Sequence, residues 1–129
     1  MARRMVLFVA LVCSMALPGC VGSTVTKVGE INYQPTPNDT VSVYLPDDAP
    51  EVLKHAGAFL PSSELPPGAI TVGWINSIGG SAASWDAFIK DAQHQAHELG
   101  GDAVVVDRFF DGGLFVQKTM TSKAVRLNP

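Results

Sequence analysis

One segment limits the fold more than any other, because residues 84–100 carry an apolar stripe with a helical period. Apolar side chains recur three or four positions apart, which is the spacing of one helix face. Ser84 is a favourable N-cap, and Gly100 is a favourable residue just beyond a helix C-terminus. The other positions are polar, so this helix has one side suited to burial and must pack on a second layer. The stripe consists of Trp85, Phe88, Ile89, Ala92, Ala96 and Leu99.

Short β segments precede and follow this helix. Residues 41–45 (VSVYL) and 69–75 (AITVGWI) alternate between the two faces of a strand. Residues 103–110 contain three consecutive valines, which is typical of a central strand that is buried on both faces. The sequence Asp-Gly-Gly at 111–113 is a hairpin signal, and residues 114–127 return as one long or two short β segments.

The alternation also predicts which side chains face the core. In the first strand it directs Val43 inward and Tyr44 to the opposite face. In the second it groups Val72 and Trp74 on the buried face, and Gly73 marks either a bulge or the close approach of a neighbour.

The order of elements predicts an α+β fold. We expect a two-layer sandwich in which one long amphipathic helix covers a small, mostly antiparallel sheet of three to five strands. The strands at 69–75 and 103–110, with the helix between them, are expected to form a right-handed split β-α-β unit.

The N-terminal segment has the pattern of a secretory signal peptide. Arg3 and Arg4 supply a charged start, and residues 6–17 form an apolar run with Ser14 as the one polar interruption. Twelve residues rise only ~18 Å as a helix, which is short for a bilayer core of ~30 Å. We therefore expect residues 1–19 to be removed rather than to remain as a membrane span.

Leu17-Pro18-Gly19-Cys20 resembles the lipobox of bacterial lipoproteins. The resemblance implies cleavage before Cys20, diacylation of its thiol and anchoring of the mature chain in a membrane. Two or three acyl chains make a firm anchor, whereas one binds only marginally. Val21 and Gly22 follow Cys20 without an aspartate, which by resemblance to Gram-negative sorting favours the outer membrane, facing the periplasm. In a Gram-positive organism the same signal would give a surface lipoprotein.

The remainder of the chain divides into a tether and a single domain. Residues 20–40 are rich in turn-forming and proline residues and are expected to link the lipid to a domain at 41–129, with a short edge strand at 27–34 (KVGEINYQ) left open as an ordered part of this tether. Without Arg3 and Arg4, seven Lys and Arg remain against twelve Asp and Glu. This acidic balance argues against a nucleic-acid partner. Cys13 leaves with the signal and Cys20 would be acylated, so we expect no disulfide and no cofactor in the mature domain.

A second resemblance covers roughly residues 68–127. Gly68-Ala69-Ile70, the run HELGGDAVVVDRF (97–109) and the closing SKAVRL (122–127) are similar to small bacterial lipoproteins of unassigned activity. The envelope-stress sensor lipoprotein of the Rcs pathway is a distant structural relative of that group. Disulfides are important in that sensor, and this chain departs from it by having none to form in the mature domain.

The candidates for chemistry are few. His94, His97 and Glu98 lie within one helical turn, a spacing open to a metal ion, but a solvated polar helix face is the favoured explanation and we expect no metal. The loop at 76–81 leads from a strand to a helix N-terminus, as in anion cradles, but matches no phosphate-binding motif. No nucleophile–base pattern is recognisable, so we expect no catalytic residues.

Adjacent aromatic residues suggest a binding surface instead. Phe109 and Phe110 must point to opposite faces of their strand, so one of them leaves the helix-covered core. Together with Tyr44 and Phe115, it is expected to form an aromatic patch that docks a partner or lies on the membrane.

These observations predict a lipid-anchored protein of the bacterial envelope that is not an enzyme and contacts another envelope protein. The same sequence leaves two alternatives open. One is an envelope-stress sensor, suggested by the resemblance to the Rcs lipoprotein. The other is a periplasmic domain that binds a metal or a small anion through His94, His97 and Glu98 or through the GGSAAS loop at 79–84.

Overall fold

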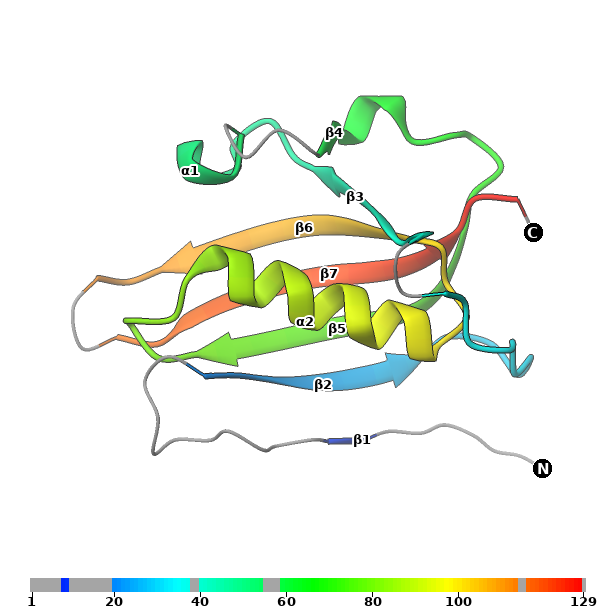
Figure 1. Ribbon diagram of the computed structural model, residues 1–129, viewed down its shortest axis with the longest axis horizontal. Helices are drawn as coiled ribbons and strands as arrows, with labels where there is room; N and C mark the ends of the chain where they lie inside the picture. The colour runs from blue at the N-terminus through cyan, green and yellow to red at the C-terminus, as the bar shows by residue number, and fades with distance from the viewer. Residues whose placement is uncertain (1–7, 10–19, 38–39, 55–58, 114–115, 129) are drawn as a thin grey trace.

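The protein is described by a computed structural model, which places residues 8–9, 20–37, 40–54, 59–113 and 116–128. Its main feature is a seven-stranded mixed sheet, with one long helix lying across one face (Figure 1). The strand order is β1-β2-β5-β7-β6-β3-β4. The strands are β1 (Phe8–Val9), β2 (Val21–Lys27), β3 (Ser42–Leu45), β4 (Leu60–Pro61), β5 (Ile70–Gly79), β6 (Ala103–Asp111) and β7 (Lys118–Arg126). The helical elements are α1 (Glu51–Lys54), the 3-10 turn η2 (Ser62–Glu64) and α2 (Trp85–Glu98).

The predicted sheet is too small, and the described strands are mixed in direction, with four antiparallel and two parallel pairings. We expected three to five mostly antiparallel strands, whereas β3 pairs parallel with both β6 and β4 in a sheet of seven. Two of the additional strands, β1 and β2, lie in segments that the sequence assigned to a signal and a tether. The third, β4, has only two residues, too few to produce an alternating pattern.

The centre of the fold is a split β-α-β unit. β7 runs antiparallel to both β5 and β6, so β5 and β6 are parallel to each other with β7 between them. α2 connects the two parallel strands, and β6 returns into β7 through the loop that begins at Gly112. The predicted split arrangement, two parallel strands joined by the helix, is confirmed.

Both ends of α2 follow from local sequence. The Ser84 side chain accepts a hydrogen bond of 3.1 Å from the Ala87 amide and so caps the N-terminus. Gly100 has a φ of +81° just after the helix, and a Cβ there would lie 2.4 Å from the Tyr33 Cβ. Only glycine suits both the backbone conformation and the contact.

The core lies between α2 and the sheet. Phe88, Ile89, Ala92 and Ala96 are essentially inaccessible and contact the inward side chains of the strands. Gly79 allows the close approach at the helix N-terminus, because a Cβ there would lie 2.9 Å from the Phe88 ring. Burying a side chain as large as Phe88 or Ile89 stabilises the fold by about 1.5–3 kcal/mol.

The segment expected to be a tether is instead largely part of the fold. β2 pairs antiparallel with β5 along its whole length, from Val21 opposite Gly79 to Lys27 opposite Gly73. Further on, the Thr36 amide donates to the His97 carbonyl at 3.1 Å. The Thr36 hydroxyl donates to the Gly101 carbonyl at 2.6 Å. The chain between Cys20 and the domain is therefore short and held against the sheet and the end of α2.

Candidate interaction surface

The two faces of the sheet are covered unequally. α2 covers one face along β2, β5 and β7 (Figure 1). On the opposite face a smaller cluster forms at one end, where Leu65, Ala69 and Leu127 pack on Tyr44 and Val125. Beyond that cluster the second face carries exposed and half-buried side chains. We call this region the open face; it comprises Thr24, Thr26, Trp74, Asn76, Ile78, Arg108, Phe110, Thr119, Thr121 and Lys123.

A bulge in β5 places Trp74 on the open face. The register shifts between Thr71 and Gly73, so Val72 is an extra residue and the alternation reverses beyond it. Val72 is buried, while Trp74 is 37% exposed. The prediction that both lie on the buried face is therefore wrong for Trp74. Gly73 both follows the bulge and makes a close approach, since a Cβ there would lie 2.6 Å from Leu99 Cδ1.

The open face combines polar and apolar groups. The Thr121 hydroxyl donates to Asn76 Oδ1 at 3.4 Å, and the Lys123 ammonium lies 5.7 Å from the centre of the Trp74 ring. Ile78 and Phe110 are 47% and 53% exposed. Side chains of this kind on a flat, partly apolar surface are suited to protein contacts.

The aromatic residues predicted to form a patch do not lie together. Tyr44 is buried in the smaller cluster, against Val105 and Val125. Phe109 packs edge-on against Trp85 on the helix side, with 5.0 Å between ring centres. Phe110 is exposed as expected, and Phe115 lies outside the described residues. The sequence identified one member of the surface correctly and missed Trp74 because the bulge reverses the alternation.

Of the four lipobox-like residues, only Cys20 lies among the described residues. Leu17, Pro18 and Gly19 lie outside the described residues. Cys20 is half-buried and directly precedes β2, so a group attached to it would sit at the end of the sheet.

The histidine cluster on α2 is partly occupied by structural contacts. His97 Nδ1 is hydrogen-bonded to the Thr36 carbonyl, and its Nε2 lies 3.5 Å from Glu98 Oε2. The rings of His94 and His97 are 5.9 Å apart. Among the described residues, no three His, Cys, Asp or Glu side chains are grouped to hold a metal ion.

The segment 76–81, which was predicted as a loop, belongs to β5 as far as Gly79 and is also committed to local contacts. Ser77 is buried, and the Gly80 carbonyl accepts the Ala83 amide at 3.0 Å in a turn before the helix. Lys118 donates to the Ala83 carbonyl at 2.6 Å rather than pointing into the loop.

A polar cluster lies beneath α2. Ser23 Oγ lies 3.0 Å from Ser77 Oγ, and Ser23 also donates to Asp91. Both hydroxyls are buried. This arrangement links β2 to β5 and α2.

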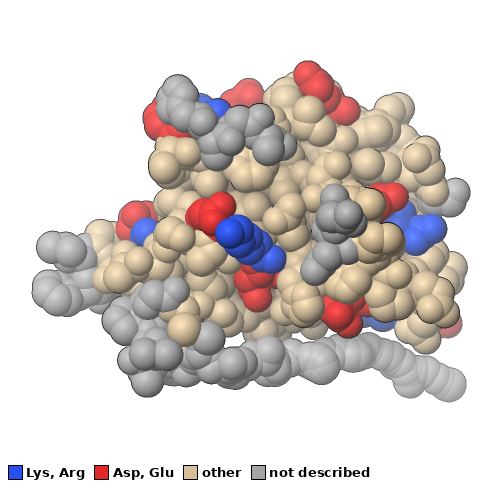
Figure 2. Space-filling model, in the orientation of Figure 1, with Lys and Arg blue, Asp and Glu red and all other residues tan. Residues whose placement is uncertain are grey.

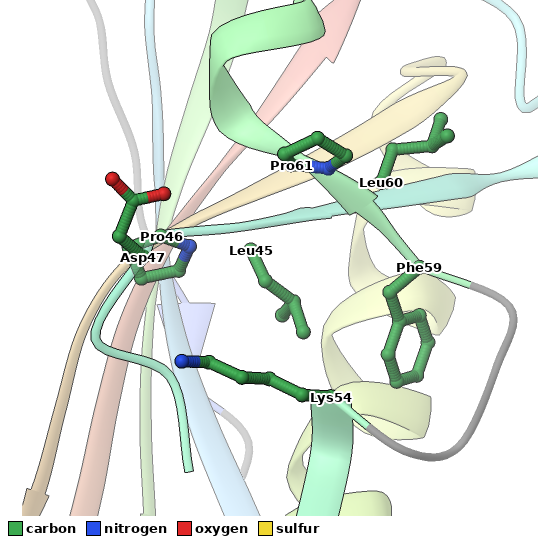
Figure 3. A pocket seen from close by; sticks show the side chains of 7 residues that line it. All are labelled: Leu45, Pro46, Asp47, Lys54, Phe59, Leu60 and Pro61. Carbon is green, nitrogen blue, oxygen red and sulfur yellow. The ribbon is translucent and has the colours of Figure 1, made fainter. Parts of the chain in front are cut away.

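One small cavity lies at the edge of the sheet beside α1 and β4 (Figure 3). Its volume is about 220 Å³, below the ~300–1,000 Å³ that is usual for small-molecule sites. Lys54 is its basic group and lies 3.5 Å from Glu51, while the Asp47 carboxylate points away from the cavity. The lining consists of Leu45, Pro46, Asp47, Lys54, Phe59, Leu60 and Pro61.

Neither positive nor negative charge dominates the helix side of the molecule. Figure 2 shows acidic and basic side chains interspersed over this face. On α2 itself Lys90 pairs with Asp86 at 3.3 Å. An exposed pair of this kind contributes little to stability and gives no basic surface for a polyanion.

Comparison with known proteins identifies the fold but not a family. No protein-family model and no curated protein matches the sequence. The structure is similar to the crystal structure of the Francisella virulence factor FvfA, with a TM-score of 0.56 and 13% identity. The match covers 81% of this chain and 96% of the Francisella chain. At this identity the similarity shows a shared fold alone.

Proposed function

We propose that the protein is a lipid-anchored, non-enzymatic component of the bacterial cell envelope that binds another envelope protein. The observation that carries the proposal is the open face, where Trp74 is exposed beside Lys123 on a sheet whose other face packs against α2.

The anchor is supported by sequence and by position. The lipobox-like residues end at Cys20, and β2 begins at the next residue. A lipid on Cys20 would be joined to the residue that directly precedes β2, at the end of the sheet. In a Gram-negative cell, the residues after Cys20 favour the outer membrane, with the domain in the periplasm.

A protein partner fits the open face better than a polyanion or a small molecule. The face is broad and mixes an aromatic ring, threonines and an asparagine, with Arg108 and Lys123 as its basic groups. Trp and Arg are enriched where interfaces bind most strongly. The hydroxyls beside Asp91 are closed off beneath α2, which is consistent with a role in packing rather than catalysis.

The anchor is tested by metabolic labelling with palmitate. We expect label in the wild-type chain and none in Cys20→Ser, with Cys13→Ser as a matched control that keeps the label. Equal labelling of the Cys20→Ser variant would reject lipidation at this residue.

The interaction surface is tested by photo-crosslinking in cells. A photoreactive residue replaces Asn76 on the open face or, as a control, Lys90, whose side chain is 74% exposed on α2. We expect a defined adduct at position 76 that decreases when Trp74→Ser is added and is absent at position 90. Adducts of the same size and strength at both positions would reject the open face as the binding surface.

A further inference from the structure

The end of the sheet beside Cys20 has a distinct composition. Pairing aligns Val21 with Gly79, Gly79 with Lys118, and Lys118 with Asp111, so these four residues form the last row of the sheet. Cys20 directly precedes this row. The chain thus brings the proposed lipid site to one end of the sheet, together with the loops that follow β5 and β6.

The next row of the open face carries exposed apolar side chains. It aligns Gly22 with Ile78, Ile78 with Thr119, and Thr119 with Phe110. Ile78 is 47% exposed and Phe110 is 53% exposed. Neighbouring strands are about 4.8 Å apart, so these two side chains are separated by about 10 Å with Thr119 between them.

Val116 extends this apolar row beyond the strands. It is 40% exposed, and a Cβ on Gly112 would lie 2.4 Å from Val116 Cγ1 and 3.3 Å from Phe110 Cε2. Val116 and Phe110 therefore lie next to each other, on the side of Gly112 where a Cβ would stand. We call Ile78, Phe110 and Val116 the anchor-end patch.

Charges at this end are balanced. Asp111 lies opposite Lys118 in the last row, and Asp86 at the start of α2 pairs with Lys90 at 3.3 Å. The end therefore has neither the basic excess that attracts anionic lipid nor a run of unpaired acids that repels a bilayer. Contact with a membrane here would depend on apolar insertion.

We propose that the anchor-end patch inserts into the surface of the bilayer that holds the Cys20 lipid. This inference rests on the proposed lipidation and adds an orientation to it. Because β2 starts one residue after Cys20, there is no spacer to lift the domain, and the patch lies beside the attachment point. Exposed apolar groups next to an anchor lose contact with water when they enter the boundary between headgroups and acyl chains.

The orientation separates two parts of the open face. Insertion at an interface reaches about 5–10 Å, which accommodates the row of Ile78 and Phe110. Trp74 lies four residues farther along β5, or about 13 Å away, and remains above the bilayer. The bilayer then takes one end of the open face, and the part around Trp74 faces sideways toward a neighbouring envelope protein.

The test uses the processed full chain reconstituted in vesicles of zwitterionic phospholipid. Single cysteines are introduced as Ile78→Cys, Phe110→Cys or Val116→Cys and labelled with an environment-sensitive fluorophore. The controls are Ile31→Cys and Ile70→Cys, which are 62% and 38% exposed in the wild type. Ile31 follows the far end of β2 and Ile70 begins β5, so both lie away from Cys20.

We expect a lipid that carries a nitroxide near its headgroup to quench the three patch labels and to leave the two control labels unquenched. Quenching at the patch is expected to be insensitive to salt, because no net charge is involved. Equal quenching at all five sites, no quenching at the patch, or loss of patch quenching in high salt would each overturn the proposal.

The experiment distinguishes a lack of bilayer insertion by the patch from a lack of lipidation at Cys20. If Cys20 is acylated, the wild-type chain takes up no thiol label and remains with the vesicles. Thiol labelling of the wild type together with its release from vesicles would reject the lipidation itself. A vesicle-bound, thiol-free wild type whose patch variants are unquenched would reject only the proposed orientation.

Discussion

The two faces of this sheet are built from the same strands but are used differently. The face beneath α2 buries Ile75, Met120 and Val106 almost completely, against Phe88 of the helix. On the open face, the neighbouring residues Trp74 and Ile78 remain in contact with solvent. In a strand, adjacent residues point to opposite faces. A shift of one position along the strand therefore moves a side chain from the packed face to the exposed face. The comparison indicates that substitutions on the two faces should have separate effects.

The largest expected effect comes from truncating an aromatic ring on the covered face. Phe88→Ala should lower the free energy of unfolding by about 3–5 kcal/mol, because it removes a fully buried ring and leaves a cavity under α2. The matched variant on the open face, Phe110→Ala, should change it by no more than about 1 kcal/mol.

Urea unfolding monitored by circular dichroism measures both variants. Equal losses in stability for Phe88→Ala and Phe110→Ala would contradict the separation of the two faces. They would indicate that Phe110 packs against part of the chain rather than facing solvent.

The sequence predicted this contrast correctly for some elements and not for others. For α2 the helical period and its end signals were enough, because both are local. For β5 the alternation failed at Trp74, since one extra residue at Val72 reverses every later side chain. The bulge was suggested by Gly73, but no local signal specified on which side of it the pattern reverses.

Non-local pairing accounts for the other differences. β2 has a polar sequence with no apolar alternation that would distinguish it from a tether, and it becomes a strand by pairing with β5. β3 follows the predicted alternation, yet Tyr44 is buried because a distant segment, including Leu65, covers it. Burial of this kind depends on where distant loops pack. The spacing of residues within one strand does not specify where those loops lie.

The second largest effect tests how closely α2 packs on the sheet. Gly79→Val should lower the free energy of unfolding by about 1–3 kcal/mol, because even a Cβ at this position would lie 2.9 Å from the Phe88 ring and 3.0 Å from Ala83 Cβ. The control is Gly68→Ala, where a Cβ meets nothing within 4 Å.

Thermal unfolding distinguishes these two variants. A transition temperature for Gly79→Val equal to that for Gly68→Ala would mean that α2 moves away from the sheet without cost. The close contact between helix and sheet would then not be a source of stability.

A smaller effect is expected at the start of the helix that makes the two faces unequal. Ser84→Ala should cost about 1 kcal/mol, because it removes the acceptor for the Ala87 amide. Ser84→Asp should retain most of the stability, since aspartate is also a good N-cap and its charge favours the helix N-terminus. Equal stability of the alanine and aspartate variants, measured by urea unfolding, would show that the cap contributes nothing.

The smallest expected effect concerns a hydroxyl on the covered face. Ser122 lies on β7 between Ile75 and Val106 and is fully buried, and among the described residues its Oγ has no hydrogen-bond partner. Ser122→Ala removes this unsatisfied group at the cost of little volume, so stability should stay unchanged or rise by up to about 1 kcal/mol.

The control variant, Ser77→Ala, should instead lose about 1 kcal/mol of stability, because Ser77 Oγ lies 3.0 Å from Ser23 Oγ in the cluster with Asp91. Differential urea unfolding compares the two variants on one face of the same sheet. A loss for Ser122→Ala as large as that for Ser77→Ala would show that the Ser122 hydroxyl is satisfied, and that the covered face tolerates polar groups only where each has a partner.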